Sequence, residues 1–141
     1  MVDYHDYKTF MERIAYFKDI AILIKTGQGN RFGIYIKDAI LPNKNYEFEP
    51  ITNNIFLYSF ETKKIYNFIG DKQKSLSFKK DKLLILGDNE LIIFNEFYDN
   101  GGYINYPFKS FDLNNLNKNV FTENNGQFYI DSVEVFSFMQ N

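Results

Sequence analysis

The sequence predicts a mostly β (α+β) fold in which two antiparallel sheets pack as a sandwich, with one or two short flanking helices. Its apolar segments are short, rich in β-branched and aromatic residues, and separated by turns that contain Gly, Asn or Asp. Aromatic residues make up 19% of the chain, with 16 Phe and 11 Tyr, and such large side chains favour sheets and thick cores. A chain of 141 residues can bury its own core, so we expect a single domain over residues 1–141.

Residues 6–17 have the period of an amphipathic helix. Phe10, Ile14 and Phe17 recur at helical spacing, and Asp6 is placed to cap the first turn. The next segment, residues 20–36, predicts a β-hairpin. Ile20–Ile24 is a continuous apolar run, typical of a strand buried on both faces, and a glycine-containing turn precedes the alternating run at 32–36.

The middle of the chain predicts two more strands and a solvated edge. A surface loop over residues 41–54 contains two of the three prolines. Apolar runs at 55–60 and 65–69 then flank a polar turn and predict a strand pair. Residues 71–82 are rich in lysine, with alternate apolar residues pointing inward, which is typical of a strand that protects the edge of a sheet.

Residues 83–94 predict a second hairpin, because two apolar runs flank a Gly-Asp-Asn turn. Residues 98–119 contain Gly, Pro and several Asn, and we expect a long structured excursion there. Two further strands are expected at 128–130 and 133–138, and no internal repeat or linker is evident.

Composition excludes several classes of function. The net charge is −2, and the chain has only two Arg, so we expect no nucleic-acid binding. The absence of Cys removes thiolate chemistry, and a single His, His5, leaves no two-His metal site. No apolar run approaches the length of a membrane span and no leader-like segment opens the chain, so we expect no membrane insertion and a cytoplasmic location.

Two patterns raise the question of chemistry. Gly27–Gly33 is glycine-rich and follows a strand, as phosphate-binding loops do, but the residues that follow alternate like a strand, which favours a plain hairpin turn. Glu134 lies between two valines in the last strand and faces away from the core if the valines face inward. It is the best candidate for a carboxylate-dependent enzyme, either a hydrolase or a redox enzyme, whereas His5 has no partners for a catalytic triad.

Four segments, in this order, resemble the TLDc domain, the module of eukaryotic oxidation-resistance proteins. They are Gly29–Ile36, Ile55–Phe60, Gly87–Ile93 and Phe128–Phe136. The abundance of Asn, Lys and Ile is similar to that of amoebozoan members. Residues that match the family signature, most of them expected to determine the fold, are Gly29, Phe32, Gly33, Phe56, Leu57, Gly87, Leu91, Glu134 and Val135.

The sequence departs from the family pattern in three places. The chain lacks the strand with which such domains usually begin, so we expect a domain without its first strand. Leu86 replaces a Phe that is common before Gly87, and Phe136 replaces a Trp that is common after the last Glu-Val; both are conservative packing changes.

The resemblance implies a two-sheet sandwich with no established catalytic centre and no cofactor. It suggests a non-catalytic protein-interaction module, with the V-type proton ATPase as partner, and a link to oxidative-stress protection. The alternative is the small carboxylate-dependent enzyme, hydrolase or redox, with Glu134 in its site.

Overall fold

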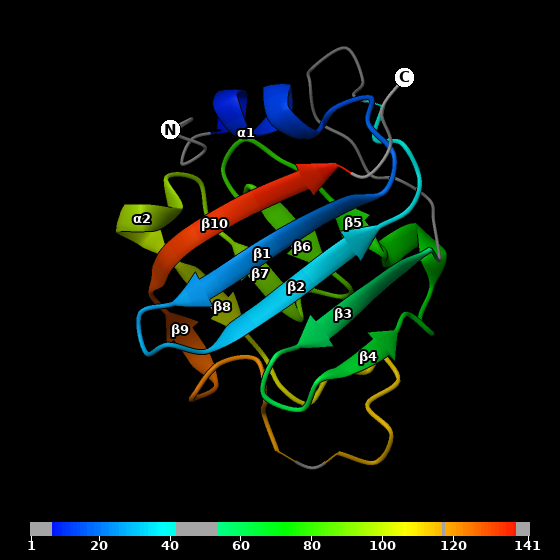
Figure 1. The fold of residues 1–141 in the computed structure, drawn as a ribbon, viewed down its shortest axis with the longest axis vertical. Coiled ribbons are helices and arrows are strands. Elements are labelled where there is room, and N and C mark those ends of the chain that lie inside the picture. The colour runs from blue at the N-terminus through cyan, green and yellow to red at the C-terminus, as the bar shows by residue number, and fades with distance from the viewer. Residues whose placement is uncertain (1–6, 42–53, 117, 138–141) are drawn as a thin grey trace.

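The structure is a computed structural model that describes residues 7–41, 54–116 and 118–137. Two five-stranded antiparallel sheets lie one behind the other, which confirms the predicted fold class (Figure 1). The first sheet has the strand order β10-β1-β2-β3-β4 and the second has the order β5-β6-β7-β8-β9. The predicted N-cap at Asp6, the residue His5 and most of the predicted loop at 41–54 lie outside the described residues.

The first sheet is built around the predicted hairpin. β1 pairs antiparallel with β2, with Lys25 opposite Arg31 next to the turn, so this hairpin is confirmed. The last strand of the chain pairs with the other side of β1. The strands of this sheet are β1 (Ile20–Thr26), β2 (Arg31–Ile36), β3 (Ile55–Ser59), β4 (Lys64–Asn67) and β10 (Ile130–Ser137).

The second sheet contains the other predicted hairpin and one strand that the sequence did not predict. β6 and β7 pair around the Gly87 turn as expected. β8 lies within the predicted excursion at 98–119 and joins β7 to β9, so describing that segment as an excursion was wrong for its first part. The strands are β5 (Leu76–Ser77), β6 (Leu84–Leu86), β7 (Leu91–Ile93), β8 (Gly102–Ile104) and β9 (Gly126–Phe128).

Three short helices complete the described chain. α1 (Tyr7–Ile14) covers one end of the sandwich, α2 (Phe97–Asn100) lies beside β10, and the 3-10 helix η1 covers Lys72–Lys74 (Figure 1). α1 ends three residues earlier than predicted because Tyr16 has a φ of 69°, which a helix does not accommodate. Phe17, predicted to lie on the buried stripe, is consequently 40% exposed.

The core lies between the inner faces of the two sheets. Ile20, Ile22 and Ile24 of β1 are buried there, whereas Ala21 and Leu23 point outward and are only half-buried. The prediction that Ile20–Ile24 is buried on both faces was therefore wrong, because no second layer of described residues covers the outer face of the first sheet.

Candidate functional site

The outer face of the first sheet is rich in apolar side chains that solvent reaches. The register places Phe136, Ala21, Tyr35 and Phe56 in one row across β10, β1, β2 and β3. The neighbouring row consists of Glu134, Leu23, Gly33, Tyr58 and Ile65. Phe136 is 44% exposed and Ile65 is 49% exposed, at opposite edges of the sheet, and the aromatic residues between them are half-buried. We call these two rows the outer face.

The aromatic rings of the outer face contact one another. The rings of Tyr35 and Phe56 are stacked, with centroids 4.6 Å apart. Tyr58 meets Phe60 edge to face at 5.0 Å, and the guanidinium of Arg31 lies 5.3 Å from the centroid of the Phe60 ring. Such contacts hold the side chains in place, so the face presents a fixed apolar surface.

Gly33 keeps the centre of the outer face flat. A Cβ atom at this position would come within 3.0 Å of Cδ2 of Leu23, so the absence of a side chain lets Leu23 lie against β2. The backbone of Gly33 is extended, and the glycine is therefore explained by close approach rather than by an unusual φ.

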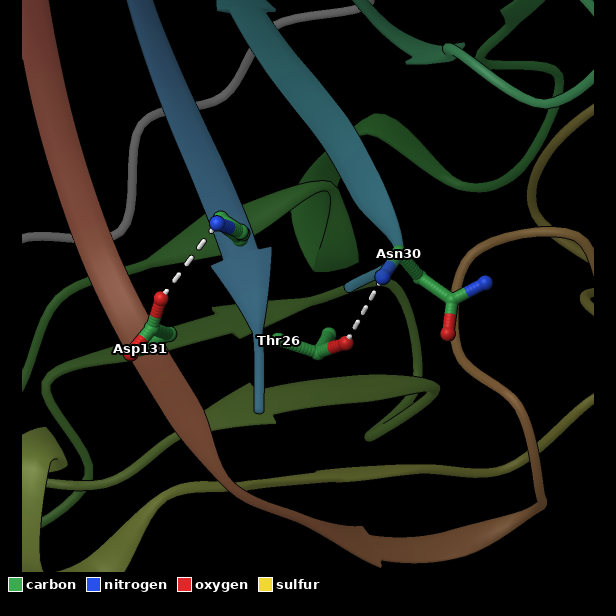
Figure 2. Close-up of polar contacts among 4 residues, drawn as sticks. Thr26, Asn30 and Asp131 are labelled. Carbon is green, nitrogen blue, oxygen red and sulfur yellow. Dashed lines mark hydrogen bonds and ion pairs between the residues drawn. The ribbon is translucent and has the colours of Figure 1, made fainter. Parts of the chain in front are cut away.

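A shallow depression of about 330 Å³ lies at the turn end of the outer face. Leu23, Lys25, Arg31, Phe60, Ser132 and Glu134 are among the residues that line it. Lys25 also lies 3.6 Å from the carboxylate of Asp131, and both side chains are about half-exposed (Figure 2). This end of the face therefore offers cations and carboxylates together beside an aromatic ring.

Glu134 itself is exposed, while Val133 and Val135 on either side are buried, as the alternation of the sequence predicts. Glu134 is the one carboxylate among the described residues that line the depression, since Asp131 contacts Lys25 but does not line it. General acid–base catalysis by a carboxyl pair needs two such groups in one cleft. The arrangement at Glu134 thus gives no support to the predicted enzyme alternative.

The turn at Gly27–Asn30 is a hairpin turn. The backbone N–H of Thr26 donates to Asn30 O at 2.9 Å, and the backbone N–H of Asn30 donates to the Thr26 hydroxyl at 3.1 Å (Figure 2). Gly29 has a φ of 93°, a conformation that favours glycine. β2 follows at once and pairs with β1, so the predicted hairpin turn is confirmed.

The hydroxyl of Tyr35 donates to Oδ1 of Asp19 at 2.5 Å. This hydrogen bond, with smaller effects of burial and of the Asp19 charge, raises the pKa of Tyr35 to about 12. The bond joins the residue before β1 to the outer face of β2.

The structure distributes the signature residues over three environments. Phe32, Leu57, Leu91 and Val135 are buried between the sheets. Gly29 and Gly87 occupy hairpin turns with positive φ. Gly33, Phe56 and Glu134 belong to the outer face, and these three are the signature residues that the fold brings together there.

Glu90, which directly follows the predicted Gly-Asp-Asn turn, is a buried carboxylate whose burial the sequence did not predict. It is 6% exposed, and its carboxylate accepts the backbone N–H groups of Asp88, Lys109 and Ser110. In the sequence, Glu90 is recognisable only as an acidic residue directly before the apolar run of β7. The loop whose N–H groups it accepts, at Lys109 and Ser110, lies about 20 residues further along the chain. Because all three donors are backbone groups, Glu90 is a structural residue.

Two other features do not identify a reaction. An apolar groove of about 570 Å³ runs along α1, with Met11, Ala15 and Tyr16 among its lining residues. It borders Tyr7, where the described chain begins, and we assign no function to it. Within the described ranges, no group of three or more potential metal ligands occurs, and no helix is both long and apolar enough to cross a membrane.

A family model for the TLDc domain matches residues 2–139, which is nearly the whole chain. The chain therefore belongs to the TLDc-domain family, as the four sequence segments indicated. A comparison with curated proteins found no match.

Proposed function

We propose that this TLDc domain is a non-catalytic interaction module that binds a partner protein through the outer face of its first sheet. The observation that carries the proposal is the set of half-buried aromatic residues in the two rows of the outer face, between Phe136 at one edge of the sheet and Ile65 at the other, which leaves an apolar surface open to solvent. Exposed apolar patches of this kind are typical of protein–protein contacts.

The apolar and charged side chains of the outer face indicate what kind of surface a partner must present. An apolar centre matches an apolar patch on the partner, and the depression adds Arg31, Lys25 and Glu134 at one end. The family suggests that this partner is a subunit of the V-type proton ATPase and that the interaction belongs to a cytoplasmic response to oxidative stress. The exposed position of Glu134 suits a contact at the rim of such an interface.

The direct test measures the affinity of the purified chain for the purified cytoplasmic sector of a V-type proton ATPase. The variant Phe136→Ser removes an exposed apolar side chain from the outer face, and Ile65→Ser does so at the opposite edge. Each is expected to weaken binding about tenfold, the loss typical of an interface anchor.

The second sheet supplies a matched control. Tyr103 is 43% exposed, nearly the same as the 44% of Phe136, but it lies on β8 of the second sheet and not on the outer face of the first. Tyr103→Ser should leave the affinity unchanged. No binding by the unmodified chain would contradict the choice of partner, and equal losses in Phe136→Ser and Tyr103→Ser would contradict the choice of face.

A further inference from the structure

The contact between Tyr35 and Asp19 places a phenol directly against a carboxylate base. The distance from Tyr35 Oη to Asp19 Oδ1 is 2.5 Å, at the short end for hydrogen bonds to an ionised oxygen. Asp19 is held in turn by its backbone, because its N–H donates to Lys37 O at 3.0 Å. The carboxylate is half-buried next to the ring that it contacts.

The ring of Tyr35 is fixed as well. It stacks on Phe56, with an interplanar angle of 18°. The residue is half-buried on the outer face, so small oxidants in solution can approach the ring without entering the core. A tyrosine phenol is protonated at neutral pH, and the raised pKa of Tyr35 extends this state into the alkaline range, so one-electron oxidation to the neutral radical must also remove a proton.

The loss of one electron makes a phenol strongly acidic, because the positive charge of the radical cation is relieved when the O–H proton leaves. A hydrogen-bonded carboxylate can accept that proton in the same step. The electron passes to the oxidant, the proton moves from Tyr35 Oη to Asp19 Oδ1, and a neutral tyrosyl radical and a carboxylic acid remain. Charge and atoms balance, and the oxidant is reduced by one electron.

We propose that Tyr35 is the residue of this chain that diffusible one-electron oxidants oxidise first, to a neutral tyrosyl radical, with Asp19 accepting the phenolic proton. The chain has no Trp and no Cys, which would otherwise compete as electron donors. The hydroxyls of two buried tyrosines contact weaker bases. Tyr66 bonds to the hydroxyl of Thr62, and Tyr106 donates to the carbonyl of Leu116. The proposal concerns the chain without a partner, in which solvent reaches the outer face, so it does not depend on which partner that face binds.

The test generates tris(bipyridine)ruthenium(III) by light at neutral pH as the one-electron oxidant, with a luminol-type reagent that traps tyrosyl radicals. Peptide mass spectrometry then gives the amount of trapped label at each tyrosine after a short exposure. Tyr35 should carry the most label, ahead of Tyr16 and Tyr129, although these are 69% and 72% exposed. An order of labelling that follows exposure would overturn the proposal, and this result needs no variant.

The variant Asp19→Asn removes the base while keeping a side chain of the same size. The amount of label at Tyr35 should fall at least about tenfold, which is less than the full rate factor that a positioned base contributes to a proton transfer. Asp38→Asn is the matched control, because this exposed carboxylate lies near in sequence and accepts hydrogen bonds from Asn54 instead. Unchanged label at Tyr35 in Asp19→Asn, with the folded circular dichroism spectrum intact, would also overturn the assignment.

Discussion

The carboxylate of Glu90 accepts the backbone N–H of Ser110 at 3.1 Å, across 20 residues of sequence. The same oxygen accepts the N–H of Lys109, and the other oxygen accepts that of Asp88 at 3.4 Å. A single side chain in the β6–β7 turn thereby holds the loop that returns from β8 towards the β4 edge of the first sheet. Ser110 O in turn accepts the backbone N–H of Ile69, just after β4, at 2.7 Å.

Replacing Glu90 by Ala should lower the free energy of unfolding by about 2–4 kcal/mol, because three backbone N–H donors lose a charged acceptor that is itself buried. Urea denaturation followed by circular dichroism measures this change. The exposed Glu123 provides the control, and Glu123→Ala should change stability by less than about 0.5 kcal/mol. A loss for Glu90→Ala no larger than the control would mean that these contacts do not stabilise the loop.

Gly87 should tolerate a side chain much less well than Gly29. Both have positive φ, 61° and 93°, so Ala is strained at either position. A Cβ at Gly87 would lie 2.2 Å from Oε1 of Glu90, whereas at Gly29 it would meet nothing within 4 Å. We expect Gly29→Ala to cost about 1–2 kcal/mol and Gly87→Ala clearly more. Equal costs in urea denaturation would show that Glu90 moves away freely.

Phe121 is the aromatic centre of the core. Its ring lies 5.3 Å from Phe108, 5.6 Å from Tyr66 and 5.9 Å from Phe32, so it joins β2 and β4 of the first sheet to the segment that follows β8. Phe121→Ala should destabilise the fold by about 3–5 kcal/mol in thermal or urea unfolding. Phe136→Ala removes the same side chain from the surface and should cost far less. Similar losses at both positions would contradict the burial of Phe121.

Tyr35 should make stability depend on pH in the alkaline range. Its pKa is raised from 10.0 to about 12 in the folded state, so protonated Tyr35 contributes stability that is complete below pH 10. That contribution is lost as the pH rises from 10 towards 12. The difference in free energy of unfolding between the unmodified chain and Tyr35→Phe should therefore be constant below pH 10 and shift against the unmodified chain above it.

The comparison with Tyr35→Phe cancels the ionisation of the other tyrosines, which both chains share. If the difference in free energy of unfolding between the unmodified chain and Tyr35→Phe stays constant from neutral pH to about pH 12, the hydrogen bond from Tyr35 to Asp19 does not persist in solution.

Both hairpins were predictable because their signals are local. Gly29 and Gly87 mark turns with positive φ, and apolar runs flank each turn. The end of α1 was not predictable, because Tyr16 is a residue that seldom adopts positive φ. β8 was missed since it is short and begins with a glycine, and its pairing with β7 and β9 depends on residues distant in sequence.

The outer face was predictable only in part. The alternation around Glu134 gave its outward direction, but the row from Phe136 to Phe56 exists only once four strands are in register. Tyr35 and Asp19 are 16 residues apart, and nothing in either local segment indicates their bond. The role of Glu90 likewise depends on a loop that no local pattern connects to it.

The claim that the outer face binds a V-type proton ATPase subunit is tested most directly by site-specific photo-cross-linking in cells. A benzoylphenylalanine replaces Phe136 in one chain and Tyr103 in another, two positions with almost equal exposure on different sheets. We expect a cross-linked product that contains an ATPase subunit from position 136 and none from position 103. The subunit appearing from position 103 alone, or from neither position, would contradict the account.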